Sequence, residues 1–427
     1  MAREDDPDRL EPDDAHILGM ESAVITGHTL KLNILAPGTA PLDVEALRDA
    51  VMKRLASAPR ATQRVDTSGR EPRWVEATDF DIRDHIRRLS KPECLSRTDL
   101  WRAVSGLMAE HLDRARPLWT FDVIGPLADG SEAIAVRIHH AMADGIAGVH
   151  FLDTVLWDAH ADQPARSAAH PAPGHVGRLG EARRLPGAVF RELGHPVSNS
   201  PLDRPITGSR ELAFTVASLA EMKAIGASRP TRATINDVLL AIVAGGLRDW
   251  LGSGAATSHL RAQVPVSLHH RDEDAKGSGN RDSFMNIDLP LVEADPLVRL
   301  DRISAETRTR KQLDDAEELY NFLHAIGRVK HIGDAVRRYA KSAREFSVSI
   351  SNVPGPRVAV GVAGRKVAHL FSSSEPALHH ALRISAISCC GDLGIALCTD
   401  PRALPDVARL ADAIEASHRQ LRSAAIE

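Results

Sequence analysis

Apolar residues along the chain follow two spacings, and segments of the two kinds succeed one another from end to end. Alternation or a short apolar run predicts a strand, whereas apolar positions three and four apart predict a helix. Strands are predicted over residues 29–35, 74–82, 116–124, 133–138, 212–216, 261–267, up to 289, 346–350, 358–362, 382–387 and 394–398. Helices are predicted over residues 43–56, 99–111, 146–156, 219–225, 235–250, 296–343 and 403–423. This succession is typical of an α/β protein.

Two of these segments carry further information. In the first strand Leu30 and Leu32 alternate with Lys31 and Asn33, which predicts one buried face and one solvated face. The helix over residues 235–250 is apolar on most faces, so we expect it to be buried.

A change of composition between residues 159 and 205, toward Pro, Ala, Gly, His and Arg, interrupts the pattern. Because 427 residues exceed what one core usually supports, we predict two domains, 1–160 and 206–427, joined by a linker, 161–205. Residues 176–193 of the linker combine apolar and basic positions. They predict either a helix on a membrane surface or, more often, a solvated helix packed against the protein.

Composition narrows the functional class. A net charge of −4 gives no case for nucleic-acid binding, and no apolar run reaches membrane-spanning length. The acidic amino terminus is unlike a secretory signal, so we expect a cytoplasmic protein. The four cysteines lack metal or disulfide spacing and are interpreted as buried free thiols, and we expect no bound metal. No Gly-x-Ser-x-Gly motif supports a serine hydrolase.

The chemistry centres on His139 and His140, where the apolar strand 133–138 ends after a predicted hairpin with strand 116–124. Asp144 and Gly145 follow, just before the helix 146–156. A strand end holds a side chain on a rigid support, and histidine exchanges protons near neutral pH. The arrangement therefore suits general-base catalysis.

The pattern His-His-x-x-x-Asp-Gly resembles the signature of the coenzyme A-dependent acyltransferase superfamily. Further segments resemble its bacterial wax ester synthase/diacylglycerol acyltransferase branch, and they occur in family order along nearly the whole chain. These segments are Pro12–Ala15 with Glu21, Pro117-Leu118-Trp119, Asn236-Asp237, Val264–Ser267 with Asn280, and Ser351–Pro356. The resemblance implies a chloramphenicol acetyltransferase-like fold, with two similar mixed-sheet domains, flanking helices and an interdomain tunnel.

The resemblance also implies an enzyme that moves a fatty acyl group from acyl-CoA to a long-chain alcohol or diacylglycerol. His140 would be the general base, with no covalent acyl-enzyme. Acyl-CoA would be a co-substrate and no cofactor would be bound. The partners implied are lipids, with peripheral contact at a membrane or lipid-droplet surface.

The other matched residues receive lesser roles. His139 is expected to orient its neighbour, Asp144 to brace the loop by pairing with an arginine, and Gly145 to allow close backbone approach. Candidate substrate-binding residues are Pro117, Leu118, Trp119, Asn236, Asp237, Ser267, Asn280, Ser351 and Asn352. Two of these groups have structural alternatives: Asn236-Asp237 as a helix cap, and Ser351-Asn352 as part of a turn. His269-His270 is interpreted as a solvated loop, and His379-His380 as a weak candidate site.

One departure from the family pattern leaves the acceptor open. Cys389-Cys390-Gly391 stands where the family usually has Tyr-Asn-Gly. An acyltransferase of specialised metabolism, using another acceptor or a carrier-protein donor, is therefore a second hypothesis. A catalytically silent lipid-binding protein is a third, although the intact His140 and Asp144 argue against it.

Overall fold

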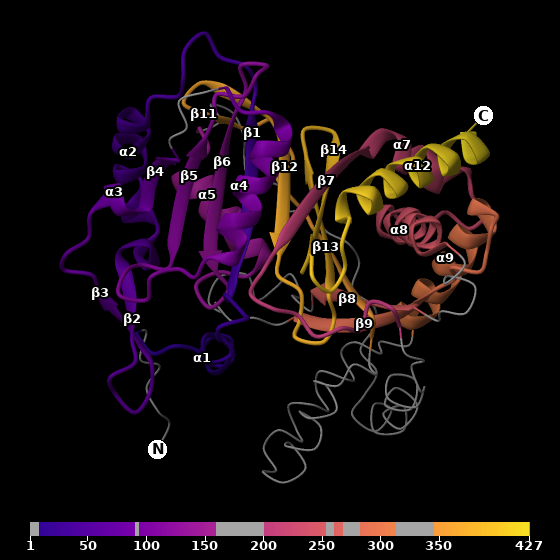
Figure 1. Ribbon diagram of the computed structural model, residues 1–427, viewed down its shortest axis with the longest axis horizontal. Coiled ribbons are helices and arrows are strands. Elements are labelled where there is room, and N and C mark those ends of the chain that lie inside the picture. The colour runs from indigo at the N-terminus through magenta and orange to yellow at the C-terminus, as the bar shows by residue number, and fades with distance from the viewer. Residues whose placement is uncertain are drawn as a thin grey trace.

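Two six-stranded sheets lie side by side in the computed structural model (Figure 1), which describes residues 8–89, 94–158, 200–252, 260–267, 282–312 and 346–426. The first sheet has the order β11 (Gly361–Val362), β12 (Arg365–Ser374), β1 (His28–Leu35), β6 (Glu132–His139), β5 (Trp119–Ile124) and β4 (Ile86–Leu89). The second has the order β7 (Glu211–Ser218), β14 (Asp392–Thr399), β13 (Leu382–Cys389), β10 (Val348–Val353), β8 (Leu260–Ser267) and β9 (Asp282–Leu289).

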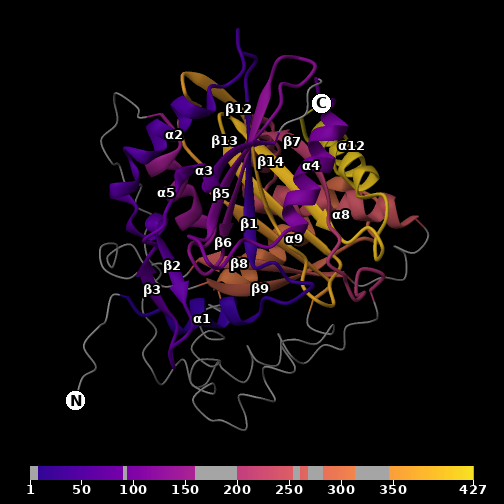
Figure 2. The same ribbon diagram turned by 60° about the vertical axis from the view of Figure 1, so that its left-hand side comes forward.

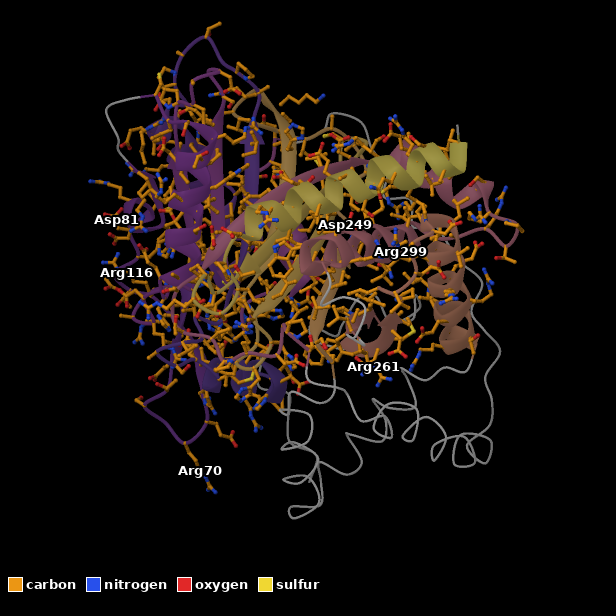
Figure 3. All side chains as sticks on the ribbon, turned by 45° about the vertical axis from the view of Figure 1, so that its right-hand side comes forward. Arg70, Asp81, Arg116, Asp249, Arg261 and Arg299 are labelled. Carbon is orange, nitrogen blue, oxygen red and sulfur yellow. The ribbon has the colours of Figure 1, made fainter. Side chains whose placement is uncertain are left out.

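Helices cover both faces of the first sheet. They are α1 (Pro12–Gly19), α2 (Val44–Met52), α3 (Ile82–His85), α4 (Arg97–Ala109) and α5 (Gly145–Val155), with short 3₁₀ turns at Leu55–Ser57 and Pro59–Thr62. Figure 2 shows α4 on the opposite side of the sheet from α2 and α5. A small hairpin, β2 (Gln63–Asp66) and β3 (Arg73–Glu76), carries Arg70 away from the body of the domain (Figure 3).

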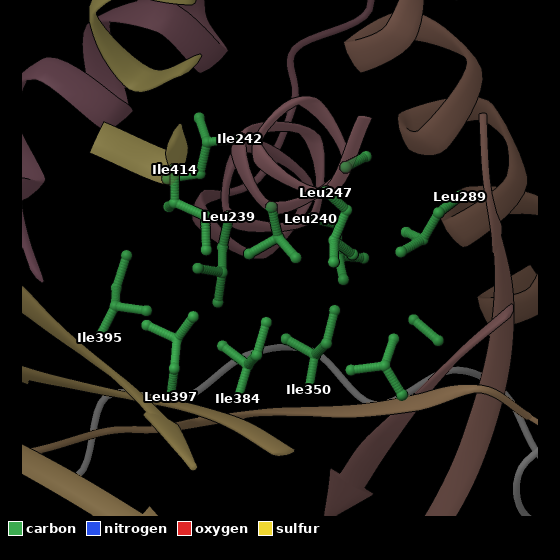
Figure 4. Close-up of a cluster of buried hydrophobic side chains, with 14 of the residues drawn as sticks. Leu239, Leu240, Ile242, Leu247, Leu289, Ile350, Ile384, Ile395, Leu397 and Ile414 are labelled. Carbon is green, nitrogen blue, oxygen red and sulfur yellow. The ribbon is translucent and has the colours of Figure 1, made fainter. Parts of the chain in front are cut away.

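The second domain packs its helices on one face of its sheet. They are α7 (Leu219–Ser228), α8 (Ile235–Leu251), α9 (Pro296–Gln312) and α12 (Val407–Ile426). Every residue of α8 from Asp237 to Leu247 is buried, which confirms the prediction for this helix. Its leucines lie over Ile350, Ile384 and Ile395 of the sheet (Figure 4).

The C-terminal half of the chain contributes to the first domain, because β11 and β12 belong to the first sheet. β12 pairs antiparallel with β1, with Leu32 opposite Phe371. A Cβ atom on Gly394 of β14 would lie 2.0 Å from the Leu370 carbonyl oxygen of β12, so glycine is required for this contact between the sheets. Residues 361–374, predicted within the second domain, therefore complete the first sheet.

Most predicted elements are confirmed, including the antiparallel pairing of β5 and β6. Three predictions differ from the structure. The strand predicted over 74–82 ends at Glu76, and the one over 358–362 is only Gly361–Val362. β1 is buried along its whole length, so it has no solvated face. Strands β2, β4 and β12 were not predicted.

Some predictions concern residues outside the described ranges, namely the linker helix 176–193 and the predicted helix beyond residue 312. The interpretation of the four cysteines as buried thiols is wrong for two of them, since Cys94 is exposed and Cys390 is partly exposed. In the described part of the chain, no helix has the length and apolar character needed to cross a bilayer.

Candidate active site

His139, the last residue of β6, uses both ring nitrogens within the protein. Its Nδ1 accepts a hydrogen bond from the Ala141 backbone N–H at 3.0 Å, so the ring proton lies on Nε2. Nε2–H donates to Glu21 Oε1 at 2.9 Å. Burial alone would raise the pKa of Glu21, but the His139 hydrogen bond and the charge of Arg114 hold it below its ordinary value. His139 is thus fixed in one tautomer.

His140 is held differently. Its backbone N–H donates to the Gly27 carbonyl at 2.8 Å, and its Nδ1 is buried without a hydrogen-bond partner among the described residues. Burial, followed by the charges of Arg383 and Lys31, lowers the pKa of His140 from 6.5 to about 4, and Asp144 opposes this shift. The imidazole is therefore neutral at neutral pH and able to accept a proton.

Gly27 lies against both histidines. It has a positive φ of 74°, and an added Cβ atom would lie 2.4 Å from His139 Nε2. Glu375, at the end of β12, accepts hydrogen bonds from the backbone N–H of Gly27 at 2.7 Å and of Thr26 at 2.9 Å. Arg210 pairs with the same carboxylate at 3.3 Å. Residues distant in sequence therefore fix the backbone of Gly27, whose carbonyl accepts the hydrogen bond from the His140 backbone N–H.

Replacing Gly27 with alanine is expected to destabilise the protein by about 2 kcal/mol and to lower kcat, because the methyl group displaces His139 and strains the backbone. Thermal unfolding and acyl-transfer kinetics measure the two effects. Gly364 has a similar φ of 76° but open space at its Cβ position, so Gly364→Ala controls for backbone strain alone. Equal effects of the two substitutions would show that the contact with His139 is unimportant.

Asp144 caps a helix. Its carboxylate accepts a hydrogen bond from the Ala147 backbone N–H at 2.7 Å, at the start of α5. The expected ion pair of Asp144 with an arginine does not occur within the described ranges, and the charge of Asp144 acts instead on Lys31, whose pKa it raises. Gly145 does allow a close approach, to Val353 of β10: an added Cβ would lie 3.0 Å from Val353 Cγ2. The two domains therefore meet at the motif.

Lys31 is a charged residue near the site that the sequence did not reveal. It is 1% exposed, and its Nζ has no hydrogen-bond partner among the described residues. Burial lowers the pKa of Lys31 to about 8, and the charge of Asp144 opposes this. Gly148 of α5 leaves room for it, since a Cβ there would lie 2.6 Å from Nζ. Alternation in β1 gave the opposite prediction, because it indicated a solvated Lys31.

Pro117, Leu118 and Trp119 lie behind the histidines. The Leu118 carbonyl accepts the His139 backbone N–H at 2.9 Å, and both Leu118 and Trp119 have no exposed surface. Trp119 donates from Nε1 to the Ala61 carbonyl at 2.9 Å. This segment supports the end of β6 from within the core.

Asn236 and Asp237 lie in the first turn of α8, and the cap itself is Thr234. Asp237 completes a capping box with Thr234 and accepts the Thr307 hydroxyl at 2.6 Å. The predicted capping role thus applies to Asp237, whereas Asn236 is not the cap residue.

The remaining candidates are dispersed. Ser351 and Asn352 lie in β10, near Val353, and Ser267 ends β8 opposite Asp282. Asn280 and His269-His270 are outside the described ranges. His380 is buried, with Nδ1 3.1 Å from Asp203 Oδ1 and its ring stacked on Phe346, so it has a structural role. The described residues contain no group of three side chains arranged to hold a metal ion.

Comparison with known protein families shows which family has this fold and this motif. Residues 10–195 match the wax ester synthase/diacylglycerol acyltransferase catalytic domain, and residues 278–422 match the WS/DGAT C-terminal domain. The chain belongs to the wax ester synthase/diacylglycerol acyltransferase (WS/DGAT) family. The resemblance found in the sequence motifs is thereby confirmed, as is the acyltransferase class of enzyme.

Individual WS/DGAT relatives agree over almost the full length. The chain is 30% identical over 410 residues to the "Probable diacyglycerol O-acyltransferase tgs1" of Mycobacterium tuberculosis, covering 88% of each protein. The wax ester synthase/diacylglycerol acyltransferase of Marinobacter aquaeolei VT8 superposes with a TM-score of 0.73 at 25% identity, over 98% of this chain and 99% of that one. The first condensation domain of the CDA synthetase shares the fold, with a TM-score of 0.58 at 15% identity over 98% and 96% of the chains.

Proposed function

We propose that this WS/DGAT enzyme transfers a fatty acyl group from acyl-CoA to the hydroxyl of a long-chain alcohol or diacylglycerol, with His140 as the general base. The observation that supports this role is the contrast between the two histidines. His139 has both ring nitrogens engaged, whereas His140 keeps a neutral ring with Nδ1 unpartnered among the described residues.

The reaction proceeds through one tetrahedral intermediate. His140 removes the proton from the acceptor hydroxyl as its oxygen attacks the thioester carbonyl carbon. The carbon–sulfur bond then breaks, and the departing thiolate takes the proton from His140, which returns to its neutral form. The ester and free coenzyme A are the products, and no acyl-enzyme forms.

The charges around His140 bear on both steps of this reaction. Arg383 and Lys31 disfavour a proton on the resting imidazole, so the base is fully available at neutral pH. The same positive charges favour the negative oxygen of the intermediate. Asp144 attracts the imidazolium that forms during the transfer. The positive charges therefore favour the oxyanion, and Asp144 partly offsets their unfavourable effect on the imidazolium.

The direct test is a panel of acceptors with the purified protein. Palmitoyl-CoA is supplied with hexadecanol, with dioleoylglycerol or with no acceptor, and released coenzyme A is measured. We expect release that depends on an acceptor. No release with any acceptor would favour the silent lipid-binding hypothesis, and equal release without an acceptor would indicate a thioesterase.

A further inference from the structure

In its central strands β10 and β13, the second sheet has one apolar face and one polar face. Val348 and Ile350 of β10, like Ile384 and Ala386 of β13, belong to the core beneath α8. Because side chains alternate along a strand, the intervening residues point to the opposite face. β10 and β13 are parallel, with Ser349 opposite Arg383 and Ser351 opposite Ser385. These four residues form what we call the polar rows.

The polar rows face the first domain at the candidate active site. Val353, two residues beyond Ser351 and about 7 Å along the strand, contacts Gly145 of the motif. Ile387, two residues beyond Ser385, packs in the core of the first domain. Arg383 is close enough for its charge to lower the pKa of His140.

Two hydroxyls in these rows have no partner. Ser349 is 4% exposed and Ser385 is 2% exposed, and neither Oγ has a hydrogen-bond partner among the described residues. A buried polar group without a partner destabilises the folded protein. Alanine would fill either position with less loss, so two orphan hydroxyls at diagonal positions of paired strands indicate that something other than folding uses them.

We propose that Ser349 and Ser385 donate hydrogen bonds to an ester or amide carbonyl oxygen of a bound substrate. This inference rests on the proposed function, which it extends from the reacting atoms to the neighbouring part of the substrate. An alkyl chain on these rows would leave both hydroxyls unsatisfied, so the fatty chains lie elsewhere. Two groups near the reacting atoms carry carbonyls: the glycerol esters of diacylglycerol and the pantetheine amides of acyl-CoA.

The test uses Ser349→Ala, Ser385→Ala and the double variant. Kinetics with palmitoyl-CoA are measured against dioleoylglycerol and against hexadecanol, which has no carbonyl. Ser417→Ala is a matched control, because Ser417 is also buried with an unpartnered hydroxyl, but lies on α12 against Gly245, in the far core.

Each source of the carbonyl predicts its own result. If the serines bind glycerol esters, the double variant loses at least about tenfold in kcat/KM with dioleoylglycerol and little with hexadecanol. If they bind pantetheine amides, the KM for palmitoyl-CoA rises equally with both acceptors. Kinetics unchanged from those of Ser417→Ala would overturn the proposal.

Two further measurements do not depend on turnover. The rise in Tm on adding palmitoyl-CoA or dioleoylglycerol should be smaller in the double variant than in the parent enzyme. Without ligand the variants should unfold at the same or a higher temperature, since the hydroxyls have no partner to lose. A lower Tm would show a structural role and overturn the proposal. A parent enzyme that binds but does not turn over would count against the proposed function alone.

Discussion

His140→Ala is expected to lower kcat for acyl transfer by ~10²–10⁴-fold, the usual contribution of a general base. The imidazole is the group we assign to remove the acceptor proton, and His139 cannot replace it because both of its nitrogens are engaged. Released coenzyme A measures turnover, and thermal unfolding confirms that the variant is folded.

His150→Ala is the matched control, because this histidine is exposed on α5, ten residues after His140. It should leave turnover unchanged. Near-normal activity of His140→Ala would eliminate the mechanism, whatever the acceptor.

Lys31→Met is expected to raise the free energy of unfolding by about 3 kcal/mol at pH 7. The pKa of Lys31 is lowered in the folded protein from 10.5 to about 8. Its protonation therefore opposes folding: the penalty is complete below pH 8 and disappears as the pH rises toward 10.5. Methionine has a similar shape and no charge, so it removes the penalty.

Urea unfolding at pH 7 and at pH 10 measures this difference. The gain should be large at pH 7 and small at pH 10. Lys366→Met is the control, because Lys366 is exposed on β12 and should give little change at either pH. A gain that does not depend on pH would mean that packing, and not charge, is responsible.

Lys31→Met should also alter the pH dependence of catalysis. Protonation inactivates His140, whose pKa is about 4, so kcat/KM of the parent enzyme should fall only as the pH drops through about 4. Losing the charge of Lys31 raises the pKa of His140 and moves this fall to higher pH. Burial and Arg383 lower the pKa more strongly than Lys31 does, so the shift should be partial.

The local parts of the site could be predicted from sequence. The apolar strand, the paired histidines and the helix after Asp144 are all encoded within 25 consecutive residues, from Glu132 to Leu156, and the structure places each one as expected. Family motifs then predicted His140, and not His139, as the base. These features depend on spacing, which one sequence displays directly.

The long-range parts could not be predicted. β12 was missed because its last residues, Ser372 to Ser374, are three consecutive serines, which are typical of a loop. Glu375 meets Gly27 across 348 positions of the chain, and Arg210 meets Val24 across 186. Lys31 appeared solvated because alternation cannot reveal that α5 covers the second face. Apart from the serines of β12, these errors come from contacts between segments that are distant in the sequence.

The insertion of β12 beside β1 has a consequence for synthesis. While the ribosome is making the chain, the first sheet lacks β11 and β12 until residue 374 emerges. Until then the backbone groups along one side of β1 have no partner. Unpaired strand edges invite aggregation. The N-terminal half of the nascent chain therefore carries an exposed strand edge until β12 emerges, and Gly27 gains its hydrogen bond to Glu375 only after residue 375 has left the ribosome.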